Sequence, residues 1–244
     1  MSTLYLDLGN TKAKWQLADA SGALTYDELS VFLQSKAPLV SKVVIASVQS
    51  AQRQQQLISQ MKAHLPVTFT QCKVTPEALG VKCAYKEVAK LGVDRWLVVL
   101  AAWHRYQQPC VIADLGTAAT IDVVDEQGHR GGYIVSGLSL ALEGLLKGTQ
   151  NIRPDPSNFQ SAHLNPGANT AEAIYNGALL SLVALIETSY QNLLKTHSQA
   201  KLILAGGDAP IVGSHIGCQF ELIEDLVFQG MRLLDEASLV ECIS

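Results

Sequence analysis

The chain has 244 residues, of which 48% are hydrophobic and only 16% are charged, and its formal net charge is −4. This length can bury a core without disulfide or metal staples, and the composition lacks the charge and polarity of a disordered chain. The balance of 22 Asp and Glu against 18 Lys and Arg argues against a nucleic-acid-binding protein, while small anionic ligands stay open because a few local cations suffice for them.

Signals for a leader peptide, a membrane span or a histidine metal site are weak. Residues 1–10 lack the basic and apolar regions of a signal peptide, and the longest apolar run, Trp96 to Trp103, is far shorter than a membrane span. None of the five cysteines has Cys-x-x-Cys spacing, and no two of the six histidines have helical ligand spacing. We therefore expect a cytoplasmic protein with free thiols and no membrane partner.

The first part of the chain alternates predicted strands and helices. Three strands in a meander come first, followed by a buried strand, an amphipathic helix, a short strand and an apolar-faced helix. Their ranges are 3–8, 12–18, 23–29, 43–48, 50–64, 67–71 and 92–106.

The second part, from residue 110, also begins with a meander that is followed by helices and strands. A buried strand, two further strands, two helices, a strand and a C-terminal helix are predicted at 110–116, 118–124, 129–135, 138–146, 170–194, 202–207 and within 222–240. The stretch 153–167 is the one extended irregular segment, and we expect it to be a mobile loop.

The two meanders match in register around the triplets Asp7-Leu8-Gly9 and Asp114-Leu115-Gly116. A tripeptide repeat alone would be weak, but the whole pattern of strand, glycine turn, strand, turn and strand recurs. The sequence therefore predicts an α/β protein of two related domains, 1–108 and 109–244.

Both glycine turns have the chemistry of a phosphate site. A glycine after a strand lets backbone N–H groups approach a phosphate, and the hydroxyls of Thr11 and Thr117 can donate to its oxygens. Gly206-Gly207-Asp208 would be the third piece, where a base or ribose lies on the backbone.

These motifs resemble the acetate and sugar kinase, heat-shock chaperone and actin superfamily. Within it, Gly92-Val93-Asp94-Arg95-Trp96 and the segment 114–120 closely resemble type III pantothenate kinase, and the resemblance runs over essentially the whole chain. It also includes Gly131-Gly132, Gly137-Leu138, Asn169-Thr170 and the stretch from Asp225-Leu226 to Gly230.

The resemblance implies two ribonuclease-H-like domains in tandem, with the nucleotide in the cleft between them. It implies a homodimer that uses ATP with Mg²⁺ and a monovalent cation, K⁺ or NH₄⁺. The implied reaction is phosphorylation of pantothenate to 4′-phosphopantothenate, the first step of coenzyme A biosynthesis.

The site residues implied by the resemblance are carried over position by position. Asp94 is the proton acceptor, and Asp114 is a ligand of the monovalent cation. The implied substrate contacts are Tyr85, Gly92, Val93, Asp94, Arg95 and Thr170. The implied nucleotide contacts are Asp7, Leu8, Gly9, Asn10, Thr11, Lys12, Ala13, Lys14 and Thr117. One departure is Ser136, where the family commonly has proline, which puts the local backbone rigidity in question.

The residue types allow a structural alternative at several of these positions. Asp94 suits a general base near the attacking alcohol, or it caps the helix and pairs with Arg95. Arg95 would pair with the substrate carboxylate or form a surface salt bridge. Lys12 and Lys14 lie on one face of a strand. Their side chains would bind phosphates, or the face would simply be exposed to solvent. Tyr85 would be an ordinary core or surface residue, and only the resemblance implies that it contacts the substrate.

Two other functions remain open on the sequence: a kinase of the same superfamily for another small alcohol or acid, and a non-catalytic nucleotide-binding transcriptional accessory factor. Asp94 favours an enzyme, because a regulator could dispense with it.

For the dimer, the helix 170–194 is the expected interface. Its apolar residues cover more than one narrow stripe: Ala173, Ile174, Ala178, Leu179, Leu182, Leu185 and Ile186. The alternative is a central helix buried within one monomer.

Overall fold

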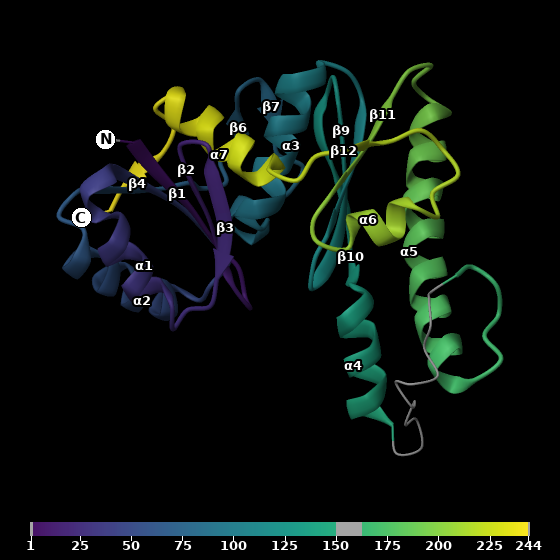
Figure 1. The fold of residues 1–244 in the computed structure, drawn as a ribbon. Coiled ribbons are helices and arrows are strands. Elements are labelled where there is room, and N and C mark those ends of the chain that lie inside the picture. Colours follow the sequence, from purple (N-terminus) through teal and green to yellow (C-terminus); the bar gives the residue numbers. More distant parts are fainter. Residues whose placement is uncertain (1, 150–162, 244) are drawn as a thin grey trace. The chain divides into compact units, whose positions relative to one another are not determined.

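The computed structural model describes residues 2–149 and 163–243 (Figure 1). The chain forms two compact units: unit 1 comprises Met1–Ala101 and Asp225–Ser244, and unit 2 comprises Ala102–Glu224. These units differ from the domains expected at 1–108 and 109–244. The division falls inside one helix, and the C-terminal segment belongs with unit 1 because its last strand pairs there.

Unit 1 is built on a six-stranded sheet of order β13-β5-β4-β1-β2-β3. The strands β1 to β3 form an antiparallel meander, while β4 and β5 continue the sheet in parallel with β1. The strand bounds are β1 Ser2–Leu8, β2 Ala13–Leu17, β3 Ala20–Leu24, β4 Val40–Ser47, β5 Thr68–Gln71 and β13 Glu241–Cys242.

The helices of unit 1 cover this sheet with apolar side chains. Leu33 of α1 and Leu57 and Met61 of α2 join Leu4 and Leu6 of β1 in one buried core. The helices are α1 Leu29–Lys36, α2 Ala51–His64, the start of α3 Val93–Tyr106 and α7 Leu226–Glu236. The short elements are η1 Ala37–Leu39, β6 Glu77–Ala78, β7 Val81–Lys82 and η2 Val88–Lys90.

Helix α7 approaches α3 closely at Gly230. A Cβ atom at this position would lie 2.3 Å from the Leu97 carbonyl oxygen, so no other residue fits without moving the backbone. The glycine in the stretch that starts at Asp225 therefore serves helix packing.

Unit 2 repeats the arrangement on a five-stranded sheet of order β10-β9-β8-β11-β12. The strands β8, β9 and β10 form the antiparallel meander, and β11 pairs in parallel with β8 as β4 does with β1. The expected repeat of two meanders, each followed by helices and strands, is confirmed. The bounds are β8 Cys110–Leu115, β9 Ala118–Asp125, β10 Gly128–Ser136, β11 Lys201–Ala205 and β12 Glu221–Leu222.

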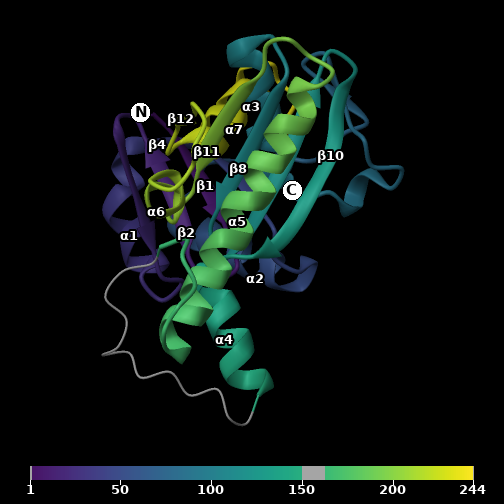
Figure 2. The ribbon, with the colours of Figure 1, turned by 90° about the vertical axis from the view of Figure 1, so that its right-hand side faces the viewer.

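Helix α5, Thr170–Leu194, lies across one face of the unit 2 sheet (Figure 2). Leu179, Leu182, Val183 and Ile186 are buried in a core with Val111 and Leu204 of the sheet. Within the described residues, α5 is the one helix long and apolar enough to cross a membrane by length and composition. Its buried stripe explains that composition. The other helices of unit 2 are α4 Leu138–Gly148 and α6 Ala209–Gly213.

Most predicted elements are present, and one prediction is wrong in its extent. The strand expected over 23–29 ends at Leu24, and α1 begins at Leu29. The carboxylate of Glu28 accepts from the Thr25 backbone N–H at 2.8 Å and from its hydroxyl at 2.9 Å, so a local turn replaces strand pairing.

Two further expectations concern the loop and the thiols. Of the irregular segment 153–167, residues 153–162 lie outside the described residues, and 163–167 form no helix or strand. All five cysteines are free, as predicted.

Candidate functional site

The first glycine turn, residues 9–12, joins β1 to β2 in unit 1. Asp7 is buried at the end of β1, whereas Asn10, Thr11 and Lys12 are exposed. A Cβ atom at Gly9 would lie 3.1 Å from the Lys12 carbonyl oxygen, so the turn is tight. Its outer N–H groups, the Thr11 hydroxyl and the Lys12 ammonium are therefore available to an anion.

The second glycine turn, at Gly116 and Thr117, joins β8 to β9 in unit 2. The Gly116 N–H donates to the Ala118 carbonyl at 3.1 Å, and the Gly137 N–H donates to the Thr117 carbonyl at 3.0 Å. A Cβ at Gly137 would lie 2.1 Å from the Gly116 carbonyl oxygen. The start of α4 thus packs directly on this turn, and Thr117 stays exposed.

The double glycine after β11 closes on the same turn. Gly206 has φ +89°, and a Cβ there would lie 2.4 Å from the Leu115 carbonyl oxygen and 2.6 Å from Asp114 Oδ1. By contrast, among the described residues other than its two chain neighbours, no atom lies within 4 Å of a Cβ built on Gly207. Gly206 therefore permits close backbone packing, and Gly207 borders open space in which a flat ring could lie.

Asp208 ties this loop to α4. Its backbone N–H donates to the Leu115 carbonyl at 2.9 Å. Burial raises the pKa of its carboxyl group, and a hydrogen bond from the Leu138 backbone N–H partly opposes that rise. Asp208 thus links the N-terminus of α4 to the end of β8.

Asp114 is half-buried at the end of β8, beside Gly206. Its carboxylate and the surrounding backbone carbonyls are oxygen donors, which suit hard cations. Within residues 2–149 and 163–243, no group of three His, Cys, Asp or Glu side chains could hold a metal ion. A cation at Asp114 would therefore need backbone and ligand oxygens to complete its shell.

The segment Gly92 to Arg95 forms the start of α3 in unit 1. The backbone N–H of Arg95 donates to Asp94 Oδ1 at 2.8 Å, and a Cβ at Gly92 would lie 2.5 Å from the same oxygen. The Asp94 carboxylate therefore folds back over Gly92 in the first turn of α3, and the side chain remains half-buried.

Arg95 and Tyr85 are brought together. The Arg95 side chain donates from Nη1 to the Tyr85 hydroxyl at 2.9 Å, and its guanidinium lies 5.7 Å from the centre of the Tyr85 ring. Only 4% of Arg95 is exposed, so the alternative of a surface salt bridge is wrong. A buried guanidinium fixed by a tyrosine suits recognition of a carboxylate.

Next to this segment, unit 1 contains a cavity of about 410 Å³. It lies at the carboxyl ends of the parallel strands β4 and β5 and is bordered by Gly92 and Val93. Its other lining residues are Ser47, Val48, Gln49, Gln54, Gln71, Cys72, Lys73, Val74, Ala89, Lys90 and Leu91. Sequence reasoning missed its glutamines, although ligands bind at the carboxyl ends of parallel strands as a rule.

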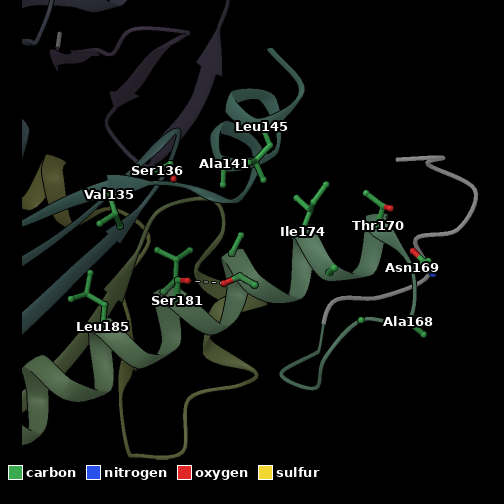
Figure 3. Close-up of a pocket in the computed structure, with 15 residues that line it drawn as sticks. Val135, Ser136, Ala141, Leu145, Ala168, Asn169, Thr170, Ile174, Ser181 and Leu185 are labelled. Carbon is green, nitrogen blue, oxygen red and sulfur yellow. Dashed lines mark hydrogen bonds between the residues drawn. The ribbon is translucent and has the colours of Figure 1, made fainter. Parts of the chain in front are cut away.

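Thr170 begins α5 in unit 2 and lines a separate cavity of about 720 Å³ (Figure 3). Leu145, Ile174 and Leu185 give this cavity a largely apolar wall from α4 and α5. Asn169 caps α5, because its side-chain oxygen accepts from the Glu172 N–H at 3.0 Å.

Ser136, the departure from the family pattern, lies at the end of β10 and also lines this cavity. It stands opposite Ala118 in the sheet, and the next residue bonds to the second turn through its N–H. Strand pairing thus supports the backbone where a proline is expected.

The predicted site residues divide between the units. The turn 7–14, Tyr85 and the segment 92–95 belong to unit 1, and Asp114, Thr117 and Thr170 belong to unit 2.

Comparison with known proteins gives one family. The model of the family "Type III pantothenate kinase" matches residues 3–192. The type III pantothenate kinase of Chromohalobacter salexigens is 34% identical over 240 residues, which cover 94% of this chain and 85% of the relative. The protein of the same name from Pseudomonas paraeruginosa is 35% identical over 244 residues, covering 94% and 97%.

Solved structures share the fold. A conserved putative Baf family transcriptional activator from Campylobacter jejuni has a TM-score of 0.67 at 21% identity, covering 97% of this chain and 99% of that one. A putative 2-dehydro-3-deoxygalactonokinase from Sinorhizobium meliloti has a TM-score of 0.54 at 9% identity, covering 97% and 99%. At these identities the likeness concerns the fold alone, and it confirms the predicted α/β fold of two ribonuclease-H-like domains in tandem.

Proposed function

Because the chain belongs to the type III pantothenate kinase family, we propose that it transfers the γ-phosphoryl group of ATP to the primary alcohol of pantothenate, which yields 4′-phosphopantothenate and ADP. This is the first step of coenzyme A biosynthesis. The observation that carries the proposal is the start of α3, where Asp94 and the buried Arg95, which is bonded to Tyr85, directly follow the cavity-lining residues Gly92 and Val93.

Asp94 is the proposed general base. The alcohol oxygen of pantothenate forms a bond to the γ-phosphorus, the bond to the β,γ-bridging oxygen breaks, and the alcohol proton passes to the Asp94 carboxylate. The Arg95 N–H supports the orientation of that carboxylate through Oδ1. The hydrogen bond that Asp94 accepts in the first turn of α3 is compatible with a role as general base, because it holds the carboxylate in place.

Arg95 is proposed to bind the carboxylate of pantothenate, and Tyr85 to hold the guanidinium fork in position. The burial of Arg95 supports this, because a charge-assisted hydrogen bond is stronger away from water. Gly92 and Val93 border the cavity in which the acceptor would lie.

The ATP phosphates are proposed to bind the two glycine turns, through the segment 7–14 and Thr117. Phosphoryl transfer requires mainly positioning and neutralisation of charge, and Mg²⁺ supplies the latter when bound with ATP. Asp114 is proposed to hold a monovalent cation, K⁺ or NH₄⁺, and oxygen donors beside Gly206 support that role.

We further propose that the enzyme works as a cytoplasmic homodimer. The exposed apolar side chains Ile134, Leu140 and Leu180 support a contact surface on unit 2, where the wall of the larger cavity is also apolar. Leu182 and Ile186 of α5 face their own core, so a contact would use Leu180 and its exposed neighbours instead.

The experiment that tests the function measures ADP release with pantothenate, several sugars and acetate as acceptors, and identifies the product by mass. We expect turnover with pantothenate. Preferential turnover of a sugar or of acetate would reject pantothenate as the acceptor.

A further inference from the structure

The carbonyl group of Gly9, in the first glycine turn, accepts hydrogen bonds from two side chains outside the turn. The hydroxyl of Tyr26, which follows β3, donates to it at 2.5 Å, and the side-chain amide of Gln49, which precedes α2, donates to the same oxygen. The amide nitrogen of Gln49 also lies 3.2 Å from the Tyr26 hydroxyl. A carbonyl oxygen has two lone pairs, so both donors can be accepted together.

Other groups hold Tyr26 in this network. Burial raises the pKa of its hydroxyl, an effect that the hydrogen bond with Gln49 partly opposes, and the hydroxyl therefore keeps its proton and remains a donor. The Arg53 guanidinium lies over the Tyr26 ring, 5.6 Å from its centre. Two segments, one after β3 and one after β4, therefore converge on one carbonyl of the turn, and the start of α2 packs on Tyr26 through Arg53.

The direction of this carbonyl decides the direction of a neighbouring donor. In a trans peptide the C=O of Gly9 and the N–H of Asn10 point in opposite directions. A carbonyl held on the Tyr26 and Gln49 side therefore aims the Asn10 N–H away from them. Glycine tolerates many backbone conformations, so the peptide after Gly9 could turn over if nothing held it.

We propose that Tyr26 and Gln49 are positioning residues that hold the Gly9 carbonyl and thereby aim the Asn10 N–H at the phosphates of ATP. The proposal rests on the proposed function in one respect, that the first glycine turn binds the nucleotide phosphates. Gln49 also lines the cavity beside Gly92 and Val93, so one side chain contacts both the phosphate turn and the wall of the acceptor cavity.

Two conservative variants remove the donors singly. Tyr26→Phe keeps the ring under Arg53 and loses the hydroxyl, and Gln49→Met keeps the side-chain length and loses the amide. Because the other donor still holds the carbonyl, each should weaken binding of a non-hydrolysable ATP analogue only about 2- to 4-fold, the lower end of the range for a single hydrogen bond. The double variant should weaken it on the order of 20-fold or more, above the product of the single effects.

Matched controls lose the same kinds of bond elsewhere. Gln54→Met removes an amide that lines the same cavity but donates to Gln71 Oε1 at 2.9 Å. Tyr190→Phe removes a hydroxyl that donates to the Ala200 carbonyl at 3.1 Å in unit 2. The double control should bind the analogue within about twofold of the wild type, because neither bond touches the turn.

Calorimetric titration of the analogue is the main measurement, with thermal unfolding of every variant beside it. KM values for ATP and pantothenate provide a second readout, and only the value for ATP should rise in Tyr26→Phe. Nucleotide affinity of the double variant within twofold of the double control would overturn the proposal, as would a lowered unfolding midpoint with unchanged affinity. If the double variant does not fold, the comparison of Gln49→Met with Gln54→Met decides.

The titration also separates this proposal from the proposed function. A wild-type protein that binds the analogue but does not phosphorylate pantothenate would refute the function, and the variant series would still test the role of Tyr26 and Gln49. A wild type that does not bind the analogue would overturn the positioning role itself.

Discussion

The same added methyl group should have different effects at the two adjacent glycines after β11. It should lower stability at Gly206 and weaken nucleotide binding at Gly207. In Gly206→Ala the new Cβ would lie 2.4 Å from the Leu115 carbonyl oxygen and 2.6 Å from Asp114 Oδ1, at a backbone φ of +89°. In Gly207→Ala the new Cβ has no atom of a non-adjacent residue within 4 Å in the described part of the chain. Gly207→Ala is therefore the matched control for backbone stability.

The cost of Gly206→Ala follows from two effects. Positive φ disfavours an L-residue by about 1–2 kcal/mol, and forcing an atom into a filled space costs about 1–3 kcal/mol. Together they lower the free energy of unfolding by about 2–5 kcal/mol, a large part of the stability of an ordinary domain. Gly207→Ala should change it by less than about 0.5 kcal/mol, as surface changes usually do.

Nucleotide binding should separate the pair further. If a base or ribose lies on the open backbone at Gly207, the added methyl group there weakens binding of an ATP analogue while the unfolding midpoint stays unchanged. Chemical denaturation and calorimetric titration of both variants measure the two effects. Equal stability of the two variants would refute the close packing of Gly206 on the end of β8, and unchanged affinity in Gly207→Ala would refute the base site.

The remaining predictions concern the cation and the acceptor. Replacing potassium with sodium or an organic cation in the assay buffer should lower turnover, and undiminished rates would remove the cation role from Asp114. Arg95→Lys should raise KM for pantothenate about 10-fold, with a smaller effect on KM for ATP. Lysine lacks the guanidinium fork that Tyr85 holds, and a charge-assisted hydrogen bond is worth about 1.5–3 kcal/mol. Equal increases in both KM values would contradict a carboxylate-binding role.

Much of the fold could be predicted because local patterns decide it. The two meanders repeat their glycine turns, and the bounds of α5 follow from Asn169 as its cap and from the apolar spacing along it. By contrast, α1 carries only Leu29 and Leu33 as buried residues, too few for a clear periodicity. The two-residue strand β13 depends on pairing with β5, from a distant part of the chain, and its own sequence predicts nothing.

The site shows the same limit. The glycine turns and the segment 92–95 stand out because each carries its chemistry in consecutive residues. Tyr26 and Gln49 carry no such signal, since their importance arises only when the fold brings both to one carbonyl. The burial of Arg95 likewise depends on tertiary packing, which the dipeptide Asp94-Arg95 does not reveal.

The most direct test of the central claim follows the phosphoryl group itself. Wild type and Asp94→Asn are incubated with γ-labelled ATP and pantothenate, and the labelled products are separated. The wild type should place the label in 4′-phosphopantothenate, and Asp94→Asn should do so about 10²- to 10⁴-fold more slowly while binding the ATP analogue within about twofold. Label found only in inorganic phosphate, or transfer by Asp94→Asn at the wild-type rate, would contradict the account.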